Sequence, residues 1–318
     1  MEASQDSAAL SGQGRRYPSV IHAIGNTPVV RLQPLERETD GAHIYLKLEY
    51  ANPGGSVKDR AARQMILDAL AGGRLRQGVT LIDSTSGNTG VAYAMIGAAL
   101  GLRVALVMPA NVSAPRKAIV RAYGAELILS DPMLGSDGAI EHCQRLVDAE
   151  PERYFYCDQY ANLSNPKAHW LSTGPEIHAQ VGAELTHVVL GLGTSGTCMG
   201  TTRYLRQHLP HVRCLALQPS EALHGLEGLK HMASSLKPAI YDEQVPHEHL
   251  AIDTETGWDM ADRIARETGL HVGHSSGANI AGALQVAKAH PNARVLTIAC
   301  DRGDRYFAPL KWERNYTW

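Results

Sequence analysis

Three short apolar runs constrain the fold of this chain most: VALVM at residues 104–108, VVLGL at 188–192 and VLTIA at 295–299. A strand without polar alternation is buried on both faces, and this is typical of parallel sheets covered by helices. Amphipathic stretches of helical period separate such runs along the chain. We therefore predict an α/β fold with two three-layer αβα domains and mostly parallel sheets.

Strand-like and helix-like patterns alternate from Tyr17 almost to the end of the chain. The predicted strands cover residues 44–48, 80–84, 103–108, 126–129, 187–190, 213–217 and 294–299. The predicted helices cover residues 57–71, 89–100, 114–123 (with Ser113 as N-cap), 139–150, 196–208, 255–267 and 278–289. Residues 219–246 have little periodicity and are predicted to form a long loop of a kind that is often functional.

Composition narrows the possible functions. The length of 318 residues suggests two domains, and the net charge of −2 provides no basic field for nucleic acid or a membrane surface. No apolar span is long enough for a transmembrane helix, and residues 1–16 are expected to form a disordered polar tail without a signal core. The five cysteines are scattered and form no C-x-x-C pair, so we expect neither disulfides nor a metal site, and a reducing cytoplasm fits.

The first motif with chemical content is NPGGSVKDR at residues 52–60, a tight turn that enters a predicted helix. Lys58 falls in the first turn, where the positive end of the helix dipole disfavours an ammonium. Such a position suits a free amine that attacks carbonyl groups. The alternative for a single lysine is a solvated surface position, so this motif decides nothing alone.

The second motif is STSGNTG at residues 84–90, directly after the TLID run at residues 80–83. Backbone N–H groups at the start of a helix, together with Ser and Thr hydroxyls, bind carboxylates and phosphates. Helix capping alone would explain one or two of these polar residues. After Ser84, the hydroxyls of Thr85, Ser86 and Thr89, together with Asn88, exceed that need, so we predict an anion site here.

The third motif, GLGTSGT at residues 191–197, also lies between a strand and a helix. Its glycines match the dinucleotide pattern G-x-G-x-x-G, which requires an acidic residue at the end of the next strand. That strand ends at Gln218, and Glu221 comes late. The hydroxyls of Thr194, Ser195 and Thr197 favour a cup for a phosphate monoester instead.

The fourth motif is GHSSG at residues 273–277, where a strand is expected to run into a helix. Its serines could cap that helix, or one hydroxyl could point into a cleft toward a ring nitrogen. Nothing in the local sequence decides between these two interpretations.

The four motifs follow IGNTP at residues 24–28 and precede CDRGDRY at residues 300–306. In this order they resemble the cysteine synthase family of fold-type II pyridoxal-phosphate (PLP) enzymes, over residues 17–307. TGPEI at 173–177, GLKHM at 228–232 and CDRGDRY are similar to the cysteine synthase B branch. The resemblance implies a tryptophan synthase β-like fold.

The resemblance also implies a role for each motif. Lys58 forms the Schiff base with PLP, Asn88 binds the 3′-oxygen of the cofactor, and Ser275 faces its pyridine nitrogen. The residues implied for the cofactor phosphate are Gly193, Thr194, Ser195, Gly196 and Thr197. Those implied for the substrate α-carboxylate are Thr85, Ser86, Thr89 and Gln159.

The implied reaction is a β-replacement that makes L-cysteine from O-acetyl-L-serine and sulfide or thiosulfate through an α-aminoacrylate. Lys58 is the general base in this scheme. Other β-replacement enzymes of the family, an O-phosphoserine-dependent cysteine synthase or a cystathionine β-synthase, stay open. So do a non-catalytic scaffold on this fold and, from the third motif alone, a nicotinamide oxidoreductase.

Two residues depart from the pattern of the relatives. Asp83 stands where the family often has Glu, and we expect it not to touch the chemistry. Lys230 stands where relatives of this branch often carry Arg, and because lysine and arginine bind anions differently, the preferred sulfur donor is left undecided.

The resemblance further implies how the chain is divided and with what it assembles. A smaller, mobile N-terminal domain is expected over residues 50–160, with the carboxylate loop. The larger domain combines residues 17–49 and 161–318 and holds the phosphate cup and Ser275. A homodimer is expected, and a complex with serine acetyltransferase is left undecided.

Overall fold

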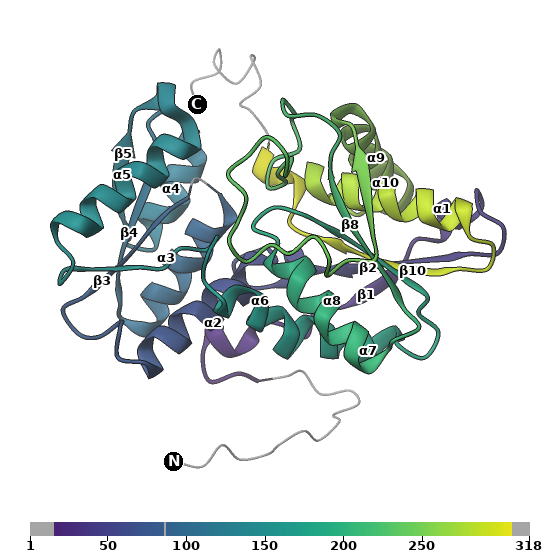
Figure 1. Ribbon diagram of the computed structural model, residues 1–318, viewed down its shortest axis with the longest axis horizontal. Helices are drawn as coiled ribbons and strands as arrows, with labels where there is room; N and C mark the ends of the chain where they lie inside the picture. The colour runs from purple at the N-terminus through teal and green to yellow at the C-terminus, as the bar shows by residue number, and fades with distance from the viewer. Residues whose placement is uncertain (1–15, 86, 307–318) are drawn as a thin grey trace, which may run out of the picture.

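The computed structural model describes residues 16–85 and 87–306, and its strands form two separate sheets (Figure 1). The larger sheet has the order β1 (Val29–Arg31), β2 (His43–Leu48), β10 (Arg294–Ala299), β7 (His187–Gly191), β8 (Arg213–Pro219) and β9 (Glu248–Ile252). The smaller sheet has the order β5 (Glu126–Ser130), β4 (Arg103–Pro109), β3 (Thr80–Ser84) and β6 (Tyr154–Tyr156). In these sheets only β1 and β2 pair in antiparallel fashion, so the predicted α/β class with mostly parallel sheets is confirmed.

Helices cover both faces of the larger sheet (Figure 1). On one face, α9 (Thr254–Thr268) and α10 (His274–Ala289) pack in a cluster with Val189. On the other face, α7 (Gly174–Val181) and α8 (Gly196–His208) pack with the neighbouring Val188. Adjacent strand residues thus belong to different cores, which is why the apolar run at 188–192 carries no polar alternation.

The smaller sheet is also a three-layer unit. The helices α2 (Lys58–Ala71) and α3 (Asn88–Leu100) share one core with Leu106 of β4, and Val120 of α4 (Ala114–Ala122) joins it. On the opposite face, α5 (Gly135–Ala149) packs against β3 and β4. Each sheet therefore has its own buried core on both sides.

The structure adds elements that the sequence patterns did not predict. These are β1, β6, β9 and a helical segment made of α6 (Ser164–Ala168), a π-helical turn (His169–Thr173) and α7. The strands β1 and β6 have only three residues each, and the edge strand β9 is largely exposed, so none of them produces an apolar run. The remaining short helical turns are Val20–Ala23, α1 (Gln33–Glu36), Glu49–Ala51, Pro132–Leu134 and Gly303–Tyr306.

Two helices begin one turn before their predicted starts: α5 at Gly135 and α10 at His274. Their first turns are rich in Gly and Ser, which have low helix propensity, and tertiary packing overrides that preference. Ser113 occupies the N-cap position of α4 as predicted, although its hydroxyl makes no capping hydrogen bond.

A buried ion network attaches the first turn of α2 to the rest of the molecule. Arg60 donates from Nε to Glu49 Oε2 at 2.7 Å and from its two Nη atoms to Glu176, both at 2.7 Å. Lys47 Nζ lies 2.8 Å from Glu176 Oε2. Burial alone would raise the pKa of Glu49, but the charge and hydrogen bonds of Arg60 outweigh it and hold this pKa at about 2.

We expect Arg60→Ala to lower the free energy of unfolding by about 3–5 kcal/mol, because it leaves Glu49 buried without its partner. Arg31→Ala is the matched control, since it removes a pair with Glu36 in which Arg31 is 40% exposed. That change is expected to cost less than about 1 kcal/mol. Guanidinium unfolding curves measure both values, and equal losses would contradict the assignment.

Candidate active site

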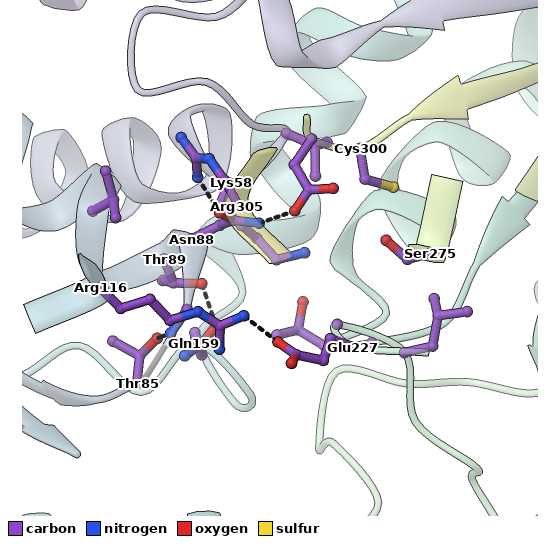
Figure 2. Close-up of a pocket in the computed structure, with 18 of the residues that line it drawn as sticks. Lys58, Thr85, Asn88, Thr89, Arg116, Gln159, Glu227, Ser275, Cys300 and Arg305 are labelled. Atoms are coloured by element: carbon purple, nitrogen blue, oxygen red, sulfur yellow. Dashed lines mark hydrogen bonds and ion pairs between the residues drawn. The ribbon is translucent and has the colours of Figure 1, made fainter. Parts of the chain in front are cut away.

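Four helices begin at the wall of one cavity of about 970 Å³, which residues of both sheets' domains line. The residues at these starts that line it are Lys58 of α2, Asn88 of α3, Ser195 before α8 and Ser275 of α10. Figure 2 shows Lys58, Asn88 and Ser275 around this space. The positive ends of the helix dipoles thus meet here, and they favour bound anions.

Lys58 is the first residue of α2 and is half-buried at the cavity wall. A main-chain hydrogen bond holds the preceding residue to the chain just after β10, because Val57 N donates to Cys300 O at 2.8 Å. Ser56 Oγ accepts a hydrogen bond from Lys58 N at 3.2 Å. The predicted helix start is therefore confirmed, and its amine belongs to the cavity instead of the open surface.

The predicted cup at residues 193–197 forms a tight turn at the start of α8. Ser195 adopts a left-handed conformation with φ of +71°, and its buried Oγ has no hydrogen-bond partner among the described residues. A Cβ atom on Gly193 would lie 2.1 Å from Gly228 O, and one on Gly196 would lie 1.9 Å from Asn165 Oδ1. Only glycine fits at these two positions, and an unpartnered hydroxyl at a helix start suits an anion.

Two buried residues outside the motifs support this cup. Asn165 Nδ2 donates to Thr194 Oγ1 at 3.0 Å, and His169 Nε2 lies 3.2 Å from Thr197 Oγ1. Burial, with the nearby Arg60 charge, lowers the pKa of His169 to about 3, so its imidazole is neutral. Both residues lie in the helical segment that produced no sequence signal.

Thr85, Thr89 and Gln159 come together on one side of the cavity (Figure 2). Thr89 Oγ1 donates to Gln159 Oε1 at 2.8 Å, and Gln159 Nε2 donates to Ser84 O at 3.4 Å. Thr85 Oγ1 accepts from Gly87 N at 3.3 Å. Ser86, which the sequence analysis assigned to the same site, lies outside the described residues.

Asp83 lies behind this side of the cavity and does not line it. Its Oδ2 accepts hydrogen bonds from Tyr93 Oη at 2.9 Å and from Gln159 N at 3.3 Å. Burial raises the pKa of Asp83 to about 7, and the Tyr93 hydrogen bond opposes this shift. Its contacts are with the protein scaffold, and it positions the backbone of Gln159.

Asn88 belongs to a hydrogen-bonded group with Asp301, Arg305 and Tyr306, three residues for which the sequence predicted no individual role. Its Nδ2 donates to Asp301 Oδ2 at 2.6 Å, while Arg305 donates to its Oδ1 and Tyr306 donates to Asp301. Burial raises the pKa of Asp301, and the bonds from Tyr306 and Asn88 oppose that shift. An amide carries two N–H donors, so Asn88 keeps a second one for a ligand.

Ser275 lies on the opposite side of the cavity from Thr85, beside Cys300 (Figure 2). Burial raises the pKa of Cys300 to about 11, with the Lys58 charge and a Ser275 hydrogen bond opposing it. The thiol at this position is therefore protonated and neutral at pH 7. Of the two interpretations of GHSSG, the one with a hydroxyl in a cleft matches the position of Ser275.

Besides the charged residues at 301–305, the cavity is lined by three others that were not predicted as site residues: Arg116, Glu227 and Lys230. The last two lie in the long segment after β8, which the structure thus places at the cavity. Lys230 Nζ lies 5.0 Å from the centre of the Tyr160 ring, and burial lowers the pKa of Lys230. In the sequence, the unusual length of that segment and the departure at Lys230 pointed to it, whereas nothing pointed to Arg116 or Glu227.

The described part of the chain contains no group of three or more His, Cys, Asp or Glu residues that could hold a metal ion. Within the same residues, no helix has the length and apolar character needed to cross a membrane.

The model of the pyridoxal-phosphate dependent enzyme family matches residues 20–301. Cysteine synthase of Aquifex aeolicus is 46% identical over 91% of this chain and 90% of its own length. The chain belongs to the cysteine synthase family of pyridoxal-phosphate dependent enzymes. Cysteine synthase B of Escherichia coli, another relative in this family, is 43% identical over 90% of the chain and 93% of its own length.

A solved structure of a cysteine synthase from Entamoeba histolytica superposes with a TM-score of 0.90 at 33% identity. The match covers 99% of this chain and 95% of that one. The family resemblance and the fold expected from it are confirmed, and the cofactor is PLP. The cavity fits this cofactor, because an amine, a glycine-lined turn and the unpartnered Ser195 hydroxyl share one space.

We expect His169→Gln to change how stability depends on pH. The folded pKa of about 3 lies below the ordinary 6.5, so His169 adds stability above pH 6.5 that is lost as the pH falls toward 3. Relative to the variant, the wild type should lose about 1.4 kcal/mol per pH unit in that window. Urea unfolding of both proteins between pH 8 and 4 measures the difference, and a constant difference would refute a neutral buried imidazole.

Proposed function

We propose that this chain is a cysteine synthase that replaces the acetoxy group of O-acetyl-L-serine with sulfide. The observation that carries the proposal is the cavity that unites Lys58, the cup at residues 193–197 and the Thr85–Thr89–Gln159 side. An amine, a phosphate site and a carboxylate site are what an amino-acid substrate and PLP require. The relatives named cysteine synthase support this choice of reaction.

Each cofactor-facing residue has a role that its position supports. Bound PLP supplies an electron sink for the charge that develops at the substrate Cα. Lys58 holds the cofactor aldehyde, and the buried hydroxyl of Ser195 joins the backbone of residues 193–197 in binding the phosphate. With PLP bound, the free amide hydrogen of Asn88 would hold its 3′-oxygen, and the neutral hydroxyl of Ser275 would lie at its ring nitrogen.

The substrate α-carboxylate is bound at the start of α3 by Thr85, Thr89 and Gln159, with Ser86 as a further proposed contact. The helix dipole there favours a carboxylate, and Asp83 holds the Gln159 backbone in place. A substrate bound this way has its Cα within the same cavity as Lys58. Thr85, Thr89 and Gln159 thus orient the amino-acid substrate, whereas residues 193–197 orient the cofactor through its phosphate.

The proton at Cα moves through Lys58. Its freed amine takes this proton, and acetate leaves Cβ with the electron pair of the broken C–O bond. Sulfide then forms the new C–S bond at Cβ, and Lys58 returns the proton to Cα. The half-buried position of Lys58 keeps the proton near the reacting carbon and away from bulk water.

We also propose that residues 50–160 form the smaller domain and close over the substrate, while residues 17–49 and 161–318 form the larger one. The four strands of the smaller sheet all lie between residues 80 and 156, which supports this division. Slower hydrogen exchange around residues 84–90 when substrate is bound is the expected sign, and unchanged exchange would oppose it.

The family resemblance supports a homodimer, and five cysteines without disulfides support a reducing cytoplasm. Light scattering of the purified enzyme tests the first proposal, and a single-chain mass at micromolar concentration would refute it. A complex with serine acetyltransferase is left open.

We expect Lys58→Ala to abolish the visible absorption band of the PLP-loaded enzyme and to lower turnover by at least about 10³-fold, because Lys58 is both the attachment point and the base. Lys167→Ala is the control, since Lys167 is an exposed lysine paired with Asp68. Spectra during titration with O-acetyl-L-serine, followed by sulfide, thiosulfate or homocysteine, give the donor response and the preferred acceptor. Full turnover by the Lys58 variant would rule out the mechanism.

We expect Thr89→Val to raise the KM for O-acetyl-L-serine by about 10-fold or more, because a hydrogen bond to a charged group is lost. Thr201→Val is the matched control: Thr201 is also buried, its hydroxyl has no partner among the described residues, and it does not line the cavity. Steady-state kinetics measure both variants. An equal KM for the two would argue against carboxylate binding by Thr89.

A further inference from the structure

An ion pair between Arg116 and Glu227 joins two walls of the cavity where it is open to solvent, and this place is called the mouth below. Arg116 comes from α4, beside the smaller sheet, and Glu227 comes from the segment between β8 and β9 of the larger sheet. Both line the cavity, and their side chains are 25% and 53% exposed. Figure 2 shows Arg116 extending from the side of Thr85 and Thr89 to meet Glu227.

These two charges face the interior of the site as well as the solvent. The Arg116 guanidinium carbon lies 5.6 Å from the centre of the Tyr306 ring, which is part of the cavity wall. The Tyr306 hydroxyl in turn donates to Asp301, the partner of Asn88. Arg116 is therefore connected, through Tyr306 and Asp301, to the group that holds Asn88 at the cavity.

The other two arginines that line the cavity also have partners within the protein. Arg305 donates to Asn88 and to Gly54 O, and Arg302 lies 3.4 Å from Asp304. Lys230 lies over the Tyr160 ring and forms no ion pair within the described part of the chain. Arg302 pairs with a close sequence neighbour, whereas Arg116 is the cavity arginine that pairs with a carboxylate from the other side of the cavity, Glu227.

A guanidinium matches phosphate and sulfate well, since it can donate two parallel hydrogen bonds to their oxygens. Because Arg116 Nη2 already donates to Glu227 Oε2, an incoming dianion meets a guanidinium whose charge is paired and a carboxylate of like charge. A neutral ester meets neither obstacle, because it needs no cation and is not repelled. The pair therefore discriminates by the charge of the group attached to the β-carbon.

We propose that Glu227 is a specificity-determining residue that neutralises Arg116 and so selects donors with an uncharged β-substituent over donors with an anionic one. The inference rests on the proposed β-replacement and names a residue that sets its substrate class. Removing the Glu227 charge frees Arg116, and the enzyme then accepts an anionic donor better.

The test compares O-acetyl-L-serine with O-phospho-L-serine, with sulfide as acceptor in both cases. For Glu227→Gln, the ratio of kcat/KM for the phosphorylated donor to that for the acetylated donor is expected to rise about five-fold, the size typical of partly exposed charges. Inorganic sulfate should also inhibit this variant more strongly than the wild type. Glu227→Ala is expected to shift the ratio in the same direction.

Glu243→Gln is the matched control, since Glu243 lies in the same segment, pairs with Lys237 at 3.8 Å and does not line the cavity. It changes the net charge equally, and its donor ratio should match the wild type. The double variant Arg116→Gln/Glu227→Gln should return the ratio to the wild-type value, because no free guanidinium remains.

Three results would overturn the inference: an unchanged ratio, equal changes for both donors, or a gain that persists in the double variant. Equal changes in kcat/KM for the two donors would mean that the ion pair has a structural role and no role in choosing the donor. A wild-type enzyme that converts neither donor would instead contradict the proposed function, so the two failures are distinguishable.

Discussion

The attachment of the start of α2 to the end of β10 is the constraint on which the site depends. Val57 N donates to Cys300 O at 2.8 Å, and two residues after Lys58 the buried Arg60 binds Glu49 and Glu176. The lysine therefore sits on a helix whose first turn is held by a main-chain bond and a buried ion network. Because α2 also packs in the core of the smaller sheet, this contact joins the two halves of the molecule next to Lys58.

The second organising feature is electrostatic. The starts of four helices meet at one cavity, and each brings backbone N–H groups and a positive dipole end. Such a site attracts anions of every kind, including the cofactor phosphate and the substrate carboxylate. Discrimination between them must come from side chains, and those at the cavity differ in their bonding: the Ser195 hydroxyl has no partner among the described residues, Gln159 accepts from Thr89, and Glu227 pairs with Arg116.

The elements that the sequence predicted best are those whose own composition enforces them. The apolar runs at 104–108, 188–192 and 295–299 became β4, β7 and β10, because a run without polar alternation is stable only between two helical layers. The short strands β1 and β6 and the exposed edge strand β9 gave no such pattern. They form because neighbouring strands supply their hydrogen bonds. The residue pattern of a short segment does not show which strand will lie beside it in the folded protein.

By itself, the sequence determined the α/β class, the four loop-and-helix motifs and the family to which they belong. It did so because glycines, hydroxyls and a lysine at helix starts are local requirements of the backbone and of anion binding. Only the tertiary structure decided that Asn165 and His169 support the cup, that Asp83 holds Gln159, and that Arg116 meets Glu227 at the mouth. These contacts join residues that lie from 28 to 111 positions apart, so they form only when the chain has folded, and the Arg116–Glu227 pair also requires the two sheets to be placed side by side.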